Sequence, residues 1–177
     1  MRNVFVSIWH NLGKTYWWSK QDKWAFANWT NEFEVVSKIT PWIKSDKFKT
    51  IFVPIWLNLT QRIKWINDRA KDWDICIEFH LDSFPWARWC STWYMTESKY
   101  AMNKAIRFQQ EYTRITWLAW RWVKWDTTNR HWRLWFVRDT KPLSLLVELW
   151  FITSKEDLDI ILDKWTAWII AGINNII

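Results

Sequence analysis

Residues 74–82 alternate strictly between polar and apolar side chains. The apolar members are Ile75, Ile77, Phe79 and Leu81, and the polar row consists of Asp74, Cys76, Glu78, His80 and Asp82. A two-residue period is typical of a β-strand with one face turned toward a core. The polar row ends with His80 and Asp82, followed by Ser83, where the strand runs into a turn. Because chemistry in open α/β sheets gathers at the carboxyl ends of strands, His80 is a candidate metal ligand or base; a structural histidine is the alternative.

Further strands and helices alternate along the chain. We expect strands at 4–8, 50–55, 74–81, 90–95, 134–138 and 143–149. Helices are expected to begin at Asn31, to span 59–72, to follow the apolar stripe from Ala101 to Ile115, and to begin again at the S/T-x-x-E spacing of 153–156. The alternation predicts an α/β fold in which residues 1–177 form a single domain. Its mostly parallel, twisted sheet would have about six strands, with helices on both faces.

Charge and hydropathy limit the possible partners. The chain carries 25 Lys and Arg against 18 Asp and Glu, a net charge of +7, so it attracts polyanions such as nucleic acid, anionic lipid or acidic wall polymers. No uncharged apolar run is long enough to cross a bilayer, and we expect no stable membrane insertion. Residues 1–8 resemble a first strand and lack the features of a signal peptide. The two cysteines cannot form a disulfide framework or a cysteine-type zinc site.

Tryptophan is abundant where glycine is scarce. The chain has 21 Trp and only 2 Gly, although glycine makes up about 7% of an average protein. An α/β fold needs glycine at turns and helix ends, where φ is positive, and Trp occurs in such segments at 17–18, 71–74 and 84–89. We hypothesise that most Trp stand where the ancestral chain has Gly, through a genetic code that reads UGA as Gly or through deliberate substitution. A true aromatic surface for stacking sugars or bases would instead gather Trp on one face.

Four chemically capable side chains fall at the ends of expected elements. His10 follows the first strand, Glu32 lies on the buried side of a helix start, His80 follows the third strand, and Glu148 lies near the end of the last strand. Two His and one carboxylate are a standard ligand set for catalytic zinc, which keeps a fourth position for water. A second carboxylate can then take a proton from that water. Together these residues favour a zinc hydrolase.

The order of these motifs resembles the zinc-dependent N-acetylmuramoyl-L-alanine amidases, the type-3 amidase family of bacterial and phage cell-wall hydrolases. The matching segments are 7–11, 30–32, 78–83, 121–124 and 147–152. The departures are tryptophans at the family's glycine positions. They include Trp9, Trp122 and Trp150, and further candidates are Trp86, Trp89, Trp117 and Trp120. By contrast, Trp65 and Trp93 fall inside an expected helix and strand and are candidates for true tryptophans.

The resemblance implies hydrolysis of the amide that joins the lactyl group of N-acetylmuramic acid to L-alanine in peptidoglycan. It implies that His10, Glu32 and His80 hold zinc, which polarises the scissile carbonyl and acidifies water. Glu148 would accept the water proton and return it to the leaving amine. The candidate substrate contacts are Arg121, Lys124 and His131. We expect a monomer that acts at the cell wall, as a phage-type endolysin released from the cytoplasm or as a bacterial autolysin without its export segment.

Other functions stay open at this point. A non-catalytic wall- or carbohydrate-binding module with exposed Trp would bind no metal. A zinc peptidase acting on the peptide stem would use the same metal site. A basic, aromatic nucleic-acid binder would lose affinity steeply with salt, but the sequence has no RNP, KH or zinc-finger pattern, so we expect no nucleic-acid partner.

Overall fold

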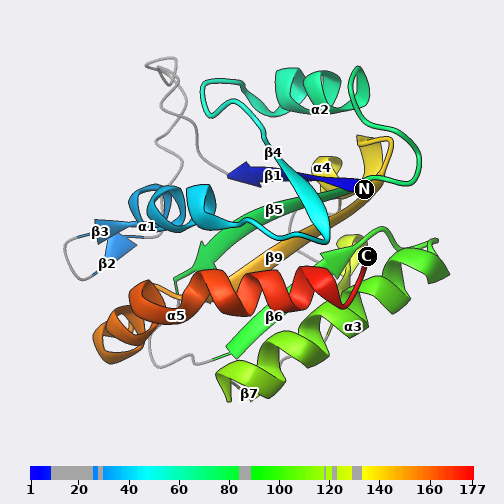
Figure 1. Ribbon diagram of the computed structural model, residues 1–177. Helices are drawn as coiled ribbons and strands as arrows, with labels where there is room; N and C mark the ends of the chain where they lie inside the picture. Colours follow the sequence, from blue (N-terminus) through cyan, green and yellow to red (C-terminus); the bar gives the residue numbers. More distant parts are fainter. Residues whose placement is uncertain (9–25, 28–29, 84–88, 118, 121–122, 129–132) are drawn as a thin grey trace.

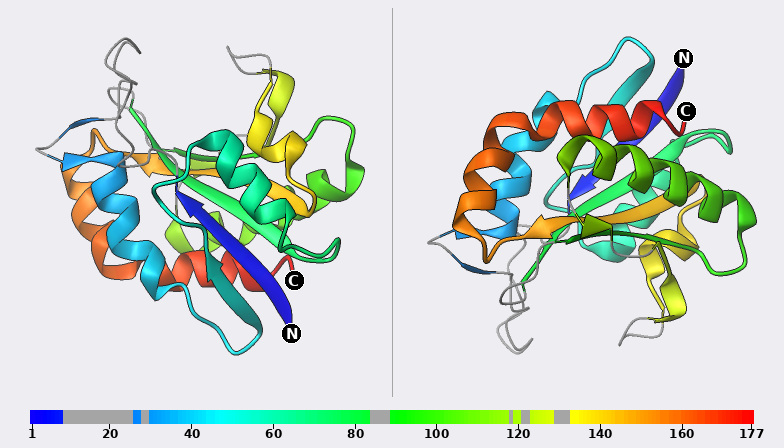
Figure 2. Two further views of the ribbon diagram at one scale, coloured as in Figure 1. Left: turned by 90° about the horizontal axis from the view of Figure 1, so that it is seen from above. Right: turned by 90° about the horizontal axis from the view of Figure 1, so that it is seen from below.

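A central β-sheet covered by helices on both faces forms the molecule (Figures 1 and 2). The computed structural model describes residues 1–8, 26–27, 30–83, 89–117, 119–120, 123–128 and 133–177. The strands are β1 (Arg2–Ile8), β2 (Phe26–Ala27), β3 (Thr30–Asn31), β4 (Phe48–Phe52), β5 (Ile75–Asp82), β6 (Trp89–Tyr94), β7 (Ala119–Trp120), β8 (Lys124–Trp125) and β9 (Leu143–Phe151). The α-helices are α1 (Glu32–Ile39), α2 (Leu59–Asn67), α3 (Lys99–Thr116), α4 (Trp135–Asp139) and α5 (Lys155–Asn174). Short 3₁₀ turns lie at Thr40–Trp42 and Asp126–Thr128.

The sheet is mostly parallel. Its strand order is β4-β1-β5-β9-β6-β7, and β8 pairs with β6, while β2 and β3 form a separate two-stranded ribbon. Strands β4, β1, β5 and β9 are parallel neighbours, whereas β6 runs antiparallel to β9. The predicted α/β class with a mostly parallel sheet is confirmed. The carboxyl ends of β1, β5 and β9 therefore meet at one edge, where ligands bind in folds of this kind.

Alternate residues of the central strands β1 and β5 pack into two separate cores. Helices α1, α3 and α5 cover one face, where Ile75, Ile77 and Phe79 of β5 join their apolar side chains. Helices α2 and α4 cover the other face and pack on Cys76 and Leu146. Figure 2 shows these two helical layers from above and below. The two-residue period that predicted β5 thus separates the two cores.

Asparagine and serine side chains define the starts of three helices. Asn31 Oδ1 accepts a hydrogen bond from the Glu34 backbone N–H at 2.9 Å, which fixes the start of α1 where the sequence predicts it. Asn58 caps α2 in a reciprocal capping box with its N3 glutamine, and Ser98 caps α3. Each cap satisfies an N–H group that has no partner inside its helix. The first of these caps positions Glu32, the first residue of α1.

A glycine allows close packing of α5 on α3. A Cβ built on Gly172 would lie 2.8 Å from Cε2 of Phe108, a side chain that is fully buried in the core. Such a distance is shorter than van der Waals contact, so this position requires the absence of a side chain.

In the part of the chain that the structure describes, no helix is both long and apolar enough to cross a membrane.

The strand predicted at 134–138 is wrong, because this segment forms α4. A short apolar run does not distinguish a strand from a buried helix turn. Phe136 and Val137 are buried against the sheet from the α2 side, and the Thr140 hydroxyl donates to the Phe136 carbonyl at the end of the helix. The predicted helix at 59–72 ends earlier, at Asn67, and the strand predicted at 50–55 begins at Phe48 and ends before Pro54.

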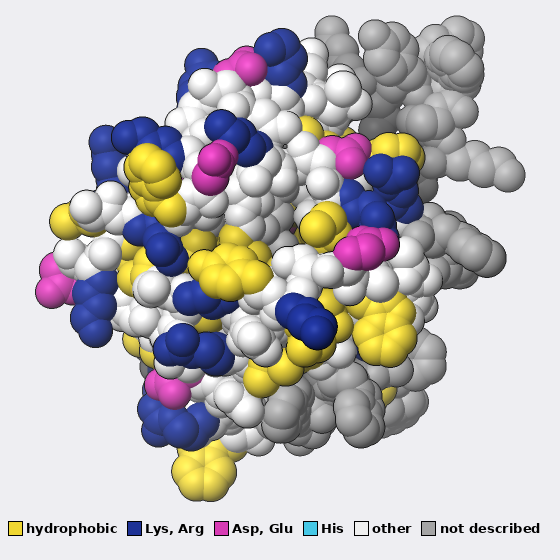
Figure 3. Space-filling model, turned by 90° about the vertical axis from the view of Figure 1, so that its right-hand side faces the viewer, with side chains coloured by type: hydrophobic (Ala, Val, Ile, Leu, Met, Phe, Trp, Pro, Cys, Tyr) yellow, Lys and Arg dark blue, Asp and Glu magenta, His cyan; other side chains and the backbone are white. Residues whose placement is uncertain are grey.

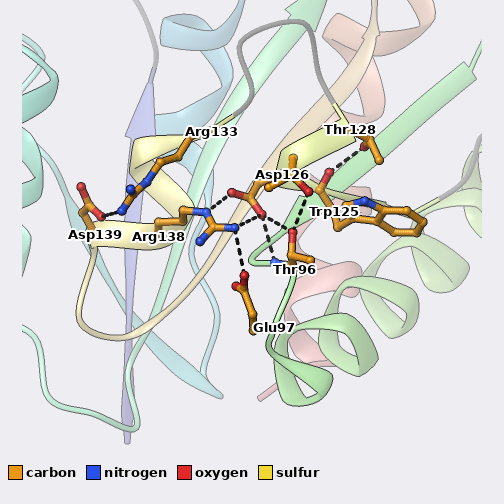
Figure 4. A network of polar contacts seen from close by, with 9 residues as sticks. Thr96, Glu97, Trp125, Asp126, Thr128, Arg133, Arg138 and Asp139 are labelled. Carbon is orange, nitrogen blue, oxygen red and sulfur yellow. Dashed lines mark hydrogen bonds and ion pairs between the residues drawn. The ribbon is translucent and has the colours of Figure 1, made fainter.

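An ion-pair network joins α4 to the end of β6 (Figure 4). The Asp126 carboxylate accepts hydrogen bonds from the Arg138 guanidinium and from the Thr96 backbone N–H and hydroxyl, the last two at 3.0 and 2.7 Å. Arg138 also reaches Glu97 at 3.4 Å. Burial opposes the charge of Asp126, but Arg138 and Thr96 outweigh it and hold the pKa of this carboxyl below its usual value.

Candidate active site

Two of the predicted metal ligands meet at the carboxyl edge of the sheet. Glu32 Oε1 lies 3.2 Å from Nδ1 of His80, and the two side chains are almost fully buried. The same oxygen accepts a hydrogen bond from the Leu81 backbone N–H at 3.0 Å. Glu32 comes from the start of α1 and His80 from the end of β5. The structure thus brings together two residues that are 48 positions apart in the sequence.

Glu148 lies beside this pair on the neighbouring strand. In the parallel register of β5 and β9, Glu148 is the partner of His80. Its Oε2 atom is buried and accepts no hydrogen bond from the residues that the structure describes. Burial, together with the charges of Glu32 and Asp82, outweighs the opposing charges of His80 and Lys124 and raises the pKa of Glu148 to about 8. A buried carboxyl with a raised pKa is a candidate for proton transfer.

The His80 ring is held between two carboxylates. Nδ1 faces Glu32, and Nε2 lies 3.3 Å from Oε2 of Glu78. Burial opposes the charged form of the ring, but the hydrogen bonds to Glu32 and Glu78 and the charge of Glu148 outweigh it. Together they raise the pKa of His80 to about 10. The two carboxylates therefore favour the protonated form of the ring.

Behind His80 lies a buried network that the sequence did not reveal. Glu78 is fully buried, and its Oε1 accepts hydrogen bonds from Nη1 of Arg62 at 2.6 Å and from the Ser7 hydroxyl at 3.1 Å. Arg62 comes from α2 and also donates to the Ile8 carbonyl at 2.8 Å. Burial alone would raise the pKa of Glu78, but His80, Arg62 and Ser7 lower it below its usual value. The one feature of the sequence that could have indicated this network is the position of Glu78, two residues before His80 and on the same face of the strand.

The Glu32–His80 pair has the spacing of two zinc ligands. Two donors of a tetrahedral zinc ion, each about 2.0–2.2 Å from the metal, lie about 3.3–3.6 Å apart, close to the 3.2 Å between Nδ1 and Oε1. Carboxylate oxygen and imidazole nitrogen are also the donors that zinc prefers. Within the described residues, no group of three His, Cys, Asp or Glu side chains could hold a metal. The third predicted ligand, His10, lies outside these residues, so the fit rests on Glu32 and His80.

The predicted substrate contacts are described in part. Lys124 is half-buried on β8, with its ammonium 4.6 Å from the centre of the Trp93 ring on β6. Its positive charge lowers the pKa of Glu148, which places Lys124 within electrostatic reach of the candidate base. Arg121 and His131 lie outside the described residues.

A sequence profile decides the family. The profile of the N-acetylmuramoyl-L-alanine amidases (Amidase_3) matches residues 27–175, which include Glu32, His80 and Glu148. The chain belongs to this family. It is an amidase that hydrolyses the bond between N-acetylmuramic acid and L-alanine in peptidoglycan. No curated protein sequence matches the amidase.

Solved structures share the fold of this amidase at low sequence identity. An N-acetylmuramoyl-L-alanine amidase from Clostridium difficile 630 is similar with a TM-score of 0.76 and 15% identity, over 98% of this chain and 95% of that one. The catalytic domain of the amidase CwlV from Bacillus (Paenibacillus) polymyxa var. colistinus has a TM-score of 0.72 and 17% identity, with coverage of 98% and 97%. The catalytic domain of an endolysin targeting Clostridia difficile has a TM-score of 0.74 and 19% identity, with coverage of 99% and 98%.

Proposed function

We propose that the chain is a zinc-dependent amidase in which His10, Glu32 and His80 hold the metal and Glu148 is the general base. The observation that carries this proposal is the Glu32–His80 pair, 3.2 Å apart, beside Glu148 on the adjacent strand, whose buried Oε2 has no hydrogen-bond partner among the described residues. Zinc bound there would supply Lewis acidity toward the scissile carbonyl and toward water. Residues 1–177 would act as one monomeric catalytic domain at the cell wall.

Glu148 would move the proton in this reaction. Its raised pKa reflects burial beside other carboxylates, and its carboxylate would form more readily next to a bound dication. It could then accept a proton from the attacking water and return it to the amine of L-alanine as the amide breaks. Lys124 would contribute a positive charge close to this step, and Arg121 and His131 are proposed to contact the glycopeptide.

The reaction products test this proposal against its alternatives. Purified protein with one equivalent of zinc is incubated with cell walls, and free L-alanine amino groups and new reducing ends are measured. We expect zinc-dependent release of L-alanine amino groups and no new reducing ends. Amino groups from other stem residues would indicate a peptidase, and wall binding without any product would indicate a non-catalytic module. Either result would overturn the proposed function.

We also propose that many Trp residues occupy glycine positions, which Trp117 supports best. Trp117 ends α3 in the left-handed conformation, with φ at 57°, and is 93% exposed. It is the one non-glycine residue with positive φ among the described positions. Glycine is the usual residue at such a helix end because a Cβ is unfavourable there.

The distribution of exposed Trp supports the same proposal. These side chains lie on different helices, strands and loops: Trp42, Trp56, Trp73, Trp117, Trp125 and Trp135. On the face shown in Figure 3, hydrophobic side chains are interspersed with Lys and Arg.

Two other tryptophans at expected glycine positions pack against neighbouring side chains. Trp150 is buried, and Trp89 contacts Phe151 edge to face. Intact-mass measurement of the protein from its native host tests the proposal, and a mass that agrees with 21 Trp would refute it.

A further inference from the structure

Glu78 is a buried carboxylate that lies directly behind the candidate ligand His80. It is fully buried, and both carboxylate oxygens are engaged. Oε1 accepts hydrogen bonds from Arg62 and Ser7 at 2.6 and 3.1 Å, and Oε2 lies 3.3 Å from Nε2 of His80. Ser7 and Glu78 are also partners in the register of β1 and β5. The carboxylate is therefore fixed by two strands and by α2 before any ligand binds.

We propose that Glu78 is a positioning residue that sets which nitrogen of His80 binds zinc. The inference rests on the proposed function. Of the two ring nitrogens, Nδ1 faces Glu32 and Nε2 faces Glu78. A carboxylate accepts hydrogen bonds and donates none when it is ionised. Glu78 therefore keeps the proton on Nε2 and leaves the lone pair of Nδ1 for the metal.

Arg62 fixes the orientation of the Glu78 carboxylate. Its Nη1 can only donate, so it holds an acceptor oxygen of residue 78 on the α2 side. Arg62 is 4% exposed and is itself held by the Ile8 carbonyl at 2.8 Å. The pair thus reaches from a helix on one face of the sheet to the ring of a candidate ligand. A carboxylate that orients a ligating histidine typically changes metal affinity 10- to 100-fold.

Glu78→Gln keeps the size of the side chain but replaces one acceptor oxygen by a donor, so it tests the positioning role separately from packing. Its amide oxygen would face the Arg62 donor, so the amide NH₂ group would face Nε2 of His80. That nitrogen must then accept, which moves the ring proton to Nδ1, the nitrogen that faces Glu32. We expect the dissociation constant for zinc, measured by competition with a chelating dye, to rise 10- to 100-fold. Glu111→Gln is the matched control, since Glu111 pairs with Arg114 at the surface of α3 and should keep wild-type affinity.

A double variant tests whether the buried pair matters only for folding. Arg62→Met/Glu78→Leu removes both charges together, a change that is often neutral for stability. The positioning role predicts a folded protein, seen by thermal unfolding, whose zinc affinity is still 10- to 100-fold weaker. Wild-type affinity in this variant would mean that Glu78 is structural and would overturn the inference.

The wild-type protein gives a test that needs no variant. The chain has three histidines, so the ¹⁵N shifts of the His80 ring can be assigned by comparison with His80→Ala. In the zinc-loaded protein we expect a protonated Nε2 and a metal-bound Nδ1. Zinc on Nε2 would overturn this inference and leave the proposed function intact. A wild-type protein that binds no zinc would overturn both.

Discussion

His80 and Glu148 are direct partners in the parallel register of β5 and β9. Backbone hydrogen bonds of the two strands therefore fix the distance between a candidate metal ligand and the candidate base. Glu32 approaches the same ring from the start of α1, with its Oε1 3.2 Å from Nδ1 of His80. The three side chains come from three separate elements that meet at one edge of the sheet. Preorganisation of this kind requires little rearrangement at the moment of reaction.

Glu148→Gln is expected to abolish most activity and to retain zinc. The amide cannot accept a proton, and general-base catalysis typically contributes about 10²- to 10⁴-fold. The release of L-alanine amino groups from cell walls should fall by that factor, while zinc content measured by mass spectrometry stays at the wild-type level. Loss of zinc together with activity would make Glu148 a ligand and would contradict the assigned role.

Glu32→Gln is expected to lose zinc and to keep its fold. The amide oxygen can still accept the hydrogen bond from the Leu81 N–H, but it is a poor zinc ligand. The loss of a direct ligand should weaken zinc binding by more than the roughly 10- to 100-fold typical of a residue behind the ligands. Glu34→Gln is the control, because Glu34 lies on the exposed side of α1 and accepts from Thr30. Equal zinc affinity in the two variants would exclude Glu32 as a ligand.

Asp126→Asn is expected to destabilise the protein in a pH-dependent manner. Arg138 and Thr96 lower the pKa of Asp126, so its ionised form contributes stability above the usual pKa of an aspartate. That contribution is lost as the pH falls through the lowered value. Asparagine should reduce the free energy of unfolding by about 1–3 kcal/mol at pH 7, and the difference from wild type should shrink below about pH 4. Urea unfolding at several pH values measures it, and a difference that does not change with pH would contradict the assignment.

Trp117→Gly is expected to stabilise the protein by about 1 kcal/mol, because glycine adopts the left-handed conformation without strain. Trp42→Gly is the control. Trp42 is 67% exposed, and its φ is not positive. Glycine should therefore destabilise the protein at position 42 by about 0.5–1 kcal/mol. The two variants are compared by thermal unfolding. Stabilisation of both, or of neither, would remove the conformational argument for glycine at position 117.

The sequence predicted the elements whose side-chain period was long and regular. The alternation in 74–82 correctly predicts the strand β5, the apolar stripe from Ala101 correctly predicts the helix α3, and Asn31 is the N-cap of α1. The segment that became α4 was misread because five residues are too few to show a helical period. Its conformation depends instead on the packing of Phe136 and Val137 against the sheet, which is a tertiary effect.

The sequence predicted only part of the candidate site. Motif order placed Glu32, His80 and Glu148 at strand and helix ends, and the structure brings these three together. The Arg62–Glu78 pair was not foreseen, because its partners are 16 residues apart and meet only through the packing of α2 on β5. The charge of Asp82 also contributes to the site, because it raises the pKa of Glu148.

The proposed mechanism requires a single zinc ion held by Glu32, His80 and His10, with Glu148 left unbound. Anomalous X-ray scattering at the zinc edge, from crystals of the zinc-loaded protein, tests it most directly. We expect one strong anomalous peak within bonding distance of Glu32 Oε and His80 Nδ1, with His10 as the third ligand and Glu148 outside the coordination sphere. A peak remote from Glu32 and His80, or no peak in zinc-loaded crystals, would contradict the account.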